Sequence, residues 1–288
     1  MKPRPFAYFA PEDVEAATTL LAEYGDDAMV LAGGQSLMPL LNFRLASPAV
    51  LVDISRLDEL RTTHPIADGG RRMGSALTHS AIEDDRIDDP TGGLLPRVAT
   101  GIAHRSIRNR GTLGGSLAHA DPLAEWPLIM CALGADVQLR SLRGERTVAA
   151  ADFVQGFFTT DRADDELCVS IDVPALAETH TYGFCKLARQ VGDFAEAMAV
   201  AIIGWSGDDT IEDVTLWLGA TRNRPVVLSR TEQVAVEGVA SLLQRDLLAE
   251  AVRLDLADVD ELGDAHRVQM HSVAVERALR EATTERVA

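Results

Sequence analysis

Apolar residues recur with a helical period at both ends of the chain. Near the N-terminus, residues 11–24 place Val14, Ala17, Leu20 and Leu21 on one face, which predicts a helix. From Ser229 onward the sequence is almost entirely amphipathic, and the pattern predicts helices over 231–243, 247–254 and 266–284. Each of these helices should bury its apolar face against another element.

Shorter apolar runs between these ends predict strands and brief helices. The expected strands lie at 28–32, 50–54, 71–74, 136–141, 146–150 and 167–173, and helices are expected after Thr78 and at 37–45, 94–102 and 123–133. Beyond a junction at 174–180, runs at 182–187, 197–205 and 214–220 predict an antiparallel sheet with a turn at 207–209. The pattern as a whole indicates an α+β protein.

Two glycine pairs interrupt this pattern. Residues 32–36 (Ala-Gly-Gly-Gln-Ser), here called the first glycine segment, follow a predicted strand and precede a predicted helix. Residues 112–116 (Thr-Leu-Gly-Gly-Ser), the second glycine segment, lie about 80 residues later. Glycines let backbone N–H groups approach an anion, and the flanking hydroxyls add donors. Two such segments predict a ligand with more than one polar part, most simply a dinucleotide whose diphosphate lies between them.

Composition and charge narrow the class of protein. With 288 residues, 47% hydrophobic and 25% charged, the chain is expected to form a globular protein with a real core. The net charge of −17 argues against a nucleic-acid partner. Neither a signal peptide nor a membrane span is evident, so a cytoplasmic location is expected. His79, His104 and His119 lack metal-ligand spacing, and the three cysteines are isolated, so no metal site and no catalytic residue is predicted.

Neither glycine pair belongs to a Gly-x-Gly-x-x-Gly or P-loop motif. The surrounding sequence instead resembles the FAD-carrying medium subunit of molybdenum hydroxylases, the family of carbon monoxide dehydrogenase and xanthine dehydrogenase. The matching segments are Leu-Ala-Gly-Gly-Gln-Ser-Leu-Met-Pro-Leu-Leu-Asn at 31–42, Ile-Arg-Asn-Arg-Gly-Thr-Leu-Gly-Gly-Ser-Leu at 107–117, His-Ala-Asp-Pro-Leu-Ala-Glu at 119–125 and Arg-Gln-Val-Gly-Asp-Phe-Ala at 189–195. Their order and spacing fit that family over nearly the whole chain.

The resemblance implies a fold and an oxidoreductase function. The expected fold has two FAD-binding subdomains of the vanillyl-alcohol-oxidase-like (PCMH) type, at 1–56 and 57–175, and a C-terminal α+β domain at 176–288. That domain would hold a three-stranded antiparallel sheet and a helical bundle. FAD on this chain would accept electrons from [2Fe–2S] clusters of a small subunit, fed by molybdopterin on a large subunit, and pass them to NAD, quinone or another acceptor. A dimer of heterotrimers is expected.

The resemblance also implies which residues contact FAD through backbone N–H groups, hydroxyls or side chains near the flavin. They are Ala32, Gly33, Gly34, Gln35, Ser36, Leu37, Thr112, Leu113, Gly114, Gly115, Ser116, Asp121, Glu125 and Phe194. A methyl group added at Gly33 or Gly115 is expected to occupy the position of a phosphate oxygen. Such a variant should lose the flavin and keep the fold.

Several of these residues have a second reading. Glu125 would contact the adenosine part or ring edge of FAD, or else be a solvated carboxylate at a helix N-terminus. Asp121 would be a ligand or a helix cap, and Phe194 would lie near the flavin ring or in the core.

Other questions stay open from the sequence. Asp193 and Lys186 would hydrogen-bond the flavin or form an ion pair. Arg108 and Arg110 would offset the diphosphate charge, line the path to the iron–sulfur subunit, or simply be surface arginines. A stand-alone flavin oxidase or reductase, and a flavin-free scaffold, are the alternative functions. The substrate and the electron acceptor are not determined by this chain's sequence.

Overall fold

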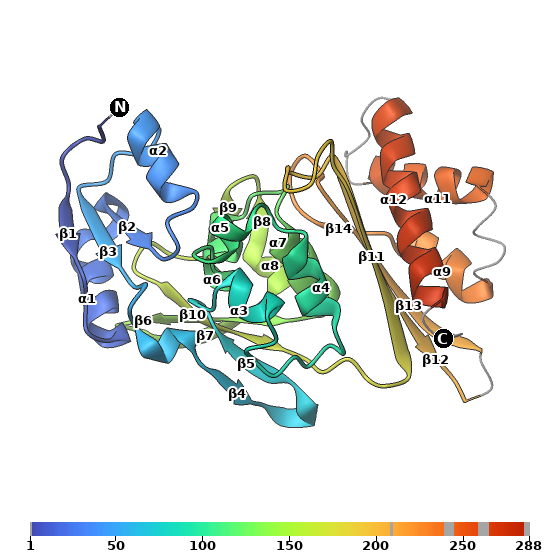
Figure 1. Cartoon of the computed structure of the whole chain (residues 1–288), viewed down its shortest axis with the longest axis horizontal. Helices are drawn as coiled ribbons and strands as arrows, with labels where there is room; N and C mark the ends of the chain where they lie inside the picture. Colours follow the sequence, from blue (N-terminus) through green and yellow to red (C-terminus); the bar gives the residue numbers. More distant parts are fainter. Residues whose placement is uncertain (1, 208–209, 239–244, 259–264, 285–288) are drawn as a thin grey trace.

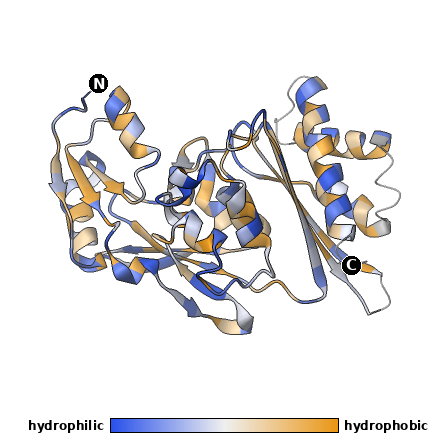
Figure 2. Cartoon of the chain, in the orientation of Figure 1, coloured by the Kyte–Doolittle hydropathy of each residue, from blue (hydrophilic) through white to orange (hydrophobic). Residues whose placement is uncertain are grey.

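Three main sheets follow one another along the chain in this computed structural model (Figure 1). The structure describes residues 2–207, 210–238, 245–258 and 265–284. The first sheet is parallel, in the order β1 (Ala7–Phe9), β3 (Val50–Asp53) and β2 (Ala28–Leu31). The first glycine segment directly follows β2 and precedes helix α2 (Leu37–Phe43). Figure 2 shows α2 as a largely hydrophobic helix near the N-terminus.

Helix α1 (Val14–Tyr24) covers the first sheet. It begins later than expected, because the Asp13 carboxylate caps it by accepting a hydrogen bond from the N–H of Ala16 at 2.7 Å. Val14, Ala17 and Leu21 are buried on its inner face. This agrees with the apolar period that predicted the helix.

The second sheet is antiparallel and has five strands. Their order is β4 (Thr63–Pro65), β5 (Arg71–Gly74), β10 (Leu167–Val173), β6 (Asp136–Ser141) and β7 (Gly144–Ala149). Between these strands the chain forms short helices α3 (His79–Glu83), α4 (Leu94–Thr100), α5 (Arg105–Arg108), α6 (Leu113–His119), α7 (Glu125–Ala132) and α8 (Ala150–Phe153), and a small hairpin of β8 (Val154–Gly156) and β9 (Thr159–Thr160).

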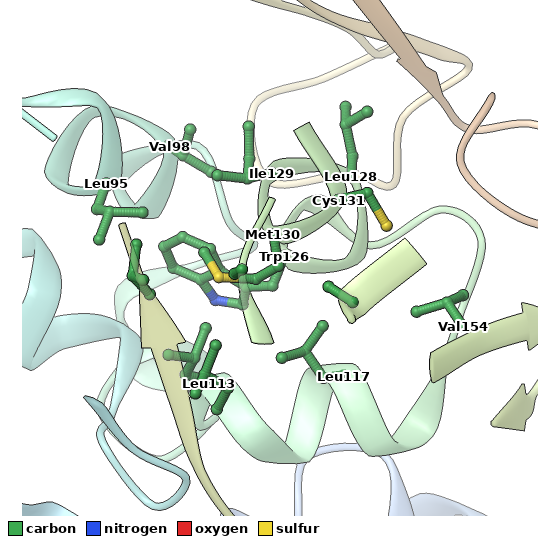
Figure 3. Packing of buried hydrophobic residues seen from close by; sticks show 14 of the residues in the cluster. Leu95, Val98, Leu113, Leu117, Trp126, Leu128, Ile129, Met130, Cys131 and Val154 are labelled. Atoms are coloured by element: carbon green, nitrogen blue, oxygen red, sulfur yellow. The ribbon is translucent and has the colours of Figure 1, made fainter. Parts of the chain in front are cut away.

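Helix α7 lies at the centre of the largest core. Trp126 is fully buried there, packed with Leu113 and Leu117 of α6 and with Leu95 and Val98 of α4 (Figure 3). The helix is apolar almost all round, which is typical of a helix enclosed on every side. The second glycine segment is therefore attached to the largest of the buried clusters.

The third sheet has four antiparallel strands, β11 (His180–Leu187), β12 (Ala197–Trp205), β13 (Ile211–Gly219) and β14 (Val226–Val227). The expectation of three strands missed β14, which is too short to show a period of its own. Ala199 and Ala201 of β12 face helices α9 (Ser229–Glu237), α11 (Arg245–Asp258) and α12 (Ala265–Thr284), whereas Val200 and Ile202 join the core around α7. Covering on both faces explains why β12 is continuously apolar.

The second glycine segment is the main departure from the sequence prediction. It was expected as a loop followed by a helix from Leu123, but Leu113 begins helix α6 and the next helix starts only at Glu125. Glycine disfavours helices, so local preference predicts a break at this position. Residues 208–209 of the predicted turn at 207–209, and residues 239–243 at the end of the predicted helix, lie outside the described residues.

Candidate functional site

The two glycine segments lie against each other. A Cβ atom added to Gly33 would lie only 2.0 Å from the carbonyl oxygen of Arg110 and 2.9 Å from the Cα of Gly111. One added to Gly115 would lie 3.8 Å from the Cβ of Ala32. The fold thus brings together two segments that are far apart in sequence, as a ligand spanning both requires.

The first glycine segment has unused backbone donors. No described residue accepts a hydrogen bond from the N–H groups of Gly33, Gly34, Gln35 or Ser36. Gly34 has a φ of +72°, a left-handed conformation that glycine adopts without strain. Successive free N–H groups in such a turn form a concave site for an anion. This segment fits a phosphate group.

The second glycine segment has its backbone donors occupied. All four N–H groups after Thr112 donate within the chain: Leu113 to Leu77 O at 2.9 Å, Gly114 to Ser75 O at 2.8 Å, Gly115 to Thr112 Oγ1 at 3.1 Å and Ser116 to Thr112 O at 3.0 Å. Thr112 is thus the N-cap of α6. The Ser116 hydroxyl is half-buried and, among the described residues, has no hydrogen-bond partner. This side chain is therefore the donor that the segment can offer to a ligand.

The glycines are required by contacts inside the chain. A methyl group at Gly33 would collide with the Arg110 carbonyl, and one at Gly115 would lie 2.6 Å from Thr112 Oγ1. At Gly114 it would lie 2.4 Å from the Cβ of Ser75. The expectation that such methyl groups would occupy a phosphate position gave the wrong reason, because protein atoms already fill that space.

His79 packs against the start of the second glycine segment and links it to helix α7. Its backbone N–H donates to Gly111 O at 2.9 Å, and its Nδ1 accepts from Trp126 Nε1 at 2.9 Å. Burial, and secondarily the charge of Arg108, lowers the pKa of His79 to about 4. The ring is therefore neutral at pH 7 with its proton on Nε2. Sequence reasoning weighed His79 only as a metal ligand, and its packing role left no sequence signal.

A cavity of about 470 Å³ opens between the first glycine segment and the residues just before the second one. Its lining combines the first glycine segment and α2 with the residues just before the second segment: Leu31, Gly33, Gly34, Gln35, Met38, Pro39, Asn42, Ile107 and Arg110. A hollow of about 540 Å³ beside α1 contains none of the predicted site residues. Of the predicted site residues, Gly33, Gly34 and Gln35 line the cavity of about 470 Å³.

Glu125 is held in a buried ion pair. Its Oε1 lies 2.7 Å from Lys186 Nζ, which also donates to Gly101 O at 3.0 Å. Burial raises the pKa of Glu125, and the charge of Lys186 opposes that rise. The reading of Glu125 as a solvated helix-end carboxylate is therefore wrong. The pair joins α7 to β11, and Lys186 has the ion-pair role that the sequence left open.

The structure also excludes the second interpretation of Asp121, as a helix cap, and that of Phe194, as a core residue. Asp121 Oδ1 accepts from the N–H of Leu123 at 2.9 Å, and the N-cap of α7 is Ala124, so Asp121 does not cap that helix. Phe194 is 65% exposed and is not a core residue. The loop that carries Phe194 contacts His104, the N-cap of α5, because a Cβ atom at Gly192 would lie 2.7 Å from the His104 ring.

The two arginines before the second segment have different surroundings. Arg108 pairs with Glu83 at 2.7 Å and donates to the carbonyls of Ile102 and Ala103. Arg110 is exposed and lines the cavity. The reading as ordinary surface arginines is therefore wrong for Arg108, whose guanidinium has a structural role.

Comparisons with known proteins point to one family. Residues 4–176 match the family described as the FAD binding domain in molybdopterin dehydrogenase. The chain is 34% identical to the caffeine dehydrogenase subunit beta of Pseudomonas sp. (strain CBB1), over 97% of this chain and 95% of that protein. It is 36% identical to the carbon monoxide dehydrogenase medium chain of Hydrogenophaga pseudoflava, over 97% of both chains.

Solved structures agree with these sequence matches. A chain of quinoline 2-oxidoreductase from Pseudomonas putida 86 superposes with a TM-score of 0.89 at 34% identity, covering 100% of both chains. A chain of carbon monoxide dehydrogenase from Hydrogenophaga pseudoflava gives 0.88 at 31% identity, covering 99% of both. None of the helices in the described part of this chain has the length and apolar composition to cross a membrane.

Proposed function

From the premise that this chain belongs to the FAD-binding medium subunits of molybdenum hydroxylases, we propose that it carries electrons within a three-subunit complex. Its FAD takes electrons from the [2Fe–2S] clusters of a small subunit and passes them to NAD, quinone or another acceptor. The clusters are reduced by a molybdopterin-containing large subunit. The complex is a dimer of heterotrimers in the cytoplasm.

The observation that carries the proposal is the row of free N–H groups at Gly33, Gly34, Gln35 and Ser36, beside a cavity that is also lined by Ile107 and Arg110, just before the second segment. These groups fit the diphosphate of FAD, because they present several donors to one anion without moving. When bound, FAD supplies the redox chemistry, and the protein supplies its position and surroundings.

The predicted site residues then have two kinds of role, since some bind FAD and others hold the site in place. The first glycine segment, with Leu37 at the start of α2, holds the diphosphate, and the Ser116 hydroxyl donates from the other side. Thr112, Leu113, Gly114 and Gly115 hold α6 in place through the bonds described above. Phe194 is exposed enough to lie against the flavin ring. We also assign Asp121 and Glu125 as FAD contacts, with Glu125 at the adenosine part or the ring edge.

The three sheets support a division into units at 1–56, 57–175 and 176–288, since the strands of each main sheet come from one of these ranges. In this arrangement FAD lies mainly between the first two units. The third unit reaches the site through the loop of Phe194. The Glu125–Lys186 ion pair fixes that third unit to α7.

The test is to purify the chain and record its flavin absorbance, and then to identify by mass spectrometry what co-purifies from its native host. One FAD per chain, and partners that contain molybdopterin and iron–sulfur clusters, are expected. A chain that stays colourless when FAD is added would contradict the proposal. FAD binding without any such partner would contradict the electron-transfer role and leave a separate flavoprotein.

A further inference from the structure

The geometry points to Arg110 as a specific counter-charge for the ligand's diphosphate, placed by the contact between the two glycine segments. The inference rests on the proposed function, because it concerns the same FAD site. It goes further because it assigns part of the FAD affinity to the side chain of Arg110, which lies outside both glycine segments.

The position of Arg110 is fixed by its backbone. Its carbonyl oxygen occupies the space beside Gly33 where a Cβ atom would lie. The residue therefore sits directly over the first glycine segment, and it lines the same cavity as Gly33, Gly34 and Gln35. A guanidinium on this residue needs no rearrangement of the backbone to face an anion held by those N–H groups.

The neighbouring cations are already neutralised. Arg105 lies 2.7 Å from Glu83 and 2.5 Å from Asp84, and Arg108 lies 2.7 Å from Glu83. Within the described ranges, Arg110 has no ion pair and no side-chain hydrogen bond. Of the three arginines in this stretch, Arg110 is thus the one whose charge is available to a ligand.

The negative charge of the rest of the chain makes a cation at this position favourable for anion binding. With a net charge of −17, the protein as a whole repels a phosphorylated ligand. Locally, however, residues 28–52 contain no Asp or Glu, although the chain has 44 acidic residues. The stretch of chain that carries the first glycine segment thus adds no negative charge of its own, and an unpaired guanidinium above it makes the site a local anion-binding region.

An arginine also fits the chemistry of a diphosphate better than a lysine. Its planar guanidinium donates two parallel hydrogen bonds to phosphate oxygens, whereas an ammonium group acts as a point charge. The variants Arg110→Gln and Arg110→Lys separate these effects, since the first removes the charge and the second keeps it. Arg61→Gln is the matched control, because Arg61 is exposed and does not line the cavity.

The test measures FAD and ADP affinity of the flavin-free full chain by calorimetry, at low and at raised salt. Arg110→Gln should weaken both ligands by about ten- to hundredfold, the usual range for a lost bond to a charged group. Arg110→Lys should recover part of the loss, and Arg61→Gln should bind as the wild type does. The salt dependence of FAD binding should also become shallower in Arg110→Gln, which a merely structural role would not produce.

The outcomes separate this inference from the proposed function. Unchanged affinity in Arg110→Gln, or weaker binding with the wild-type salt dependence, overturns the role of Arg110 while FAD binding stands. A wild-type chain that binds neither FAD nor ADP overturns both. A thermal melt of each variant shows whether it is folded, and an exposed side chain such as Arg110 should leave the midpoint unchanged.

Discussion

The two glycine segments have nearly the same composition, yet their backbones do opposite things. In the first, the N–H groups from Gly33 to Ser36 have no described acceptor, and the chain turns through a left-handed glycine. In the second, the N–H groups from Leu113 to Ser116 are all used to start helix α6 and to attach it to Ser75 and Leu77, in the turn after β5.

This difference shows that a glycine pair can serve two purposes. In the first segment, glycine exposes donors to a ligand and lets the two segments touch. In the second, Gly114 is required because α6 passes so close to Ser75 that no side chain fits between them. The first segment is thus a ligand site, and the second is mainly the rigid support that completes it.

The largest expected effect is a loss of stability at low pH, caused by His79 beside the second glycine segment. Because burial lowers the pKa of His79 from 6.5 to about 4, the folded state keeps it neutral while the unfolded chain takes up a proton between those pH values. Stability contributed by His79 is therefore complete above pH 6.5 and is lost as the pH falls toward 4, by about 3 kcal/mol in total. Urea unfolding at a series of pH values measures this loss.

His271 titrates in the same window, because burial also lowers its pKa to about 4. His79→Gln should consequently remove part of the pH dependence, because the lowered pKa values of His119 and His271 contribute to the same loss. An unchanged slope in His79→Gln would show that the support of the second segment does not depend on a neutral imidazole.

Gly33→Ala should separate the two segments. The added methyl meets the Arg110 carbonyl, and relieving that overlap costs about 1–3 kcal/mol, which should lower FAD affinity by up to about 100-fold. Fluorescence titration of the flavin-free protein measures this. Gly207→Ala is the control, since an added Cβ there meets nothing within 4 Å. Full FAD affinity in Gly33→Ala would refute the contact between the segments.

Thr112→Val keeps the shape of the side chain and removes the N-cap of α6. The N–H of Gly115 then loses its acceptor, so the free energy of unfolding should fall by about 1–2 kcal/mol. Chemical denaturation without FAD is the measurement. No loss of stability would mean that the second segment is not the support described here.

Ser116→Ala should lower FAD affinity without lowering stability, the reverse of Thr112→Val, and its effect should be the smallest of these variants. Because no described residue bonds to this hydroxyl, stability should stay unchanged, while FAD affinity falls by about fivefold, equivalent to about 1 kcal/mol. A thermal melt and an FAD titration on the same preparation distinguish the two. A stability loss with intact FAD affinity would reverse the assigned roles of Thr112 and Ser116.

Much of this fold followed from sequence patterns, and the failures have physical causes. Strands β10 and β12 began and ended where their apolar runs did, because buried runs are bounded by turns. Helix α6 was missed because tertiary packing overrides the poor helix preference of its glycines. Spacing gave the glycine segments as candidates but did not indicate which of them had free N–H groups.

Side-chain partners were the least predictable part of the site. Glu125 and Lys186 are 61 positions apart, and only the docking of β11 beside α7 brings them together. Arg108 and Arg110 are equivalent in the sequence, but α5 turns the first toward Glu83 and leaves the second at the cavity. Such differences depend on the direction of each side chain, which periodicity alone does not give.

Hydrogen exchange of glycine amides tests the central claim most directly, in a 15N-glycine-labelled chain with and without FAD. The account predicts that the amide protons of Gly33 and Gly34 exchange rapidly until FAD binds and then become protected. Those of Gly114 and Gly115 should be protected in both states. Protection of Gly33 and Gly34 that does not change with FAD, or a larger change at Gly114 and Gly115, would contradict it.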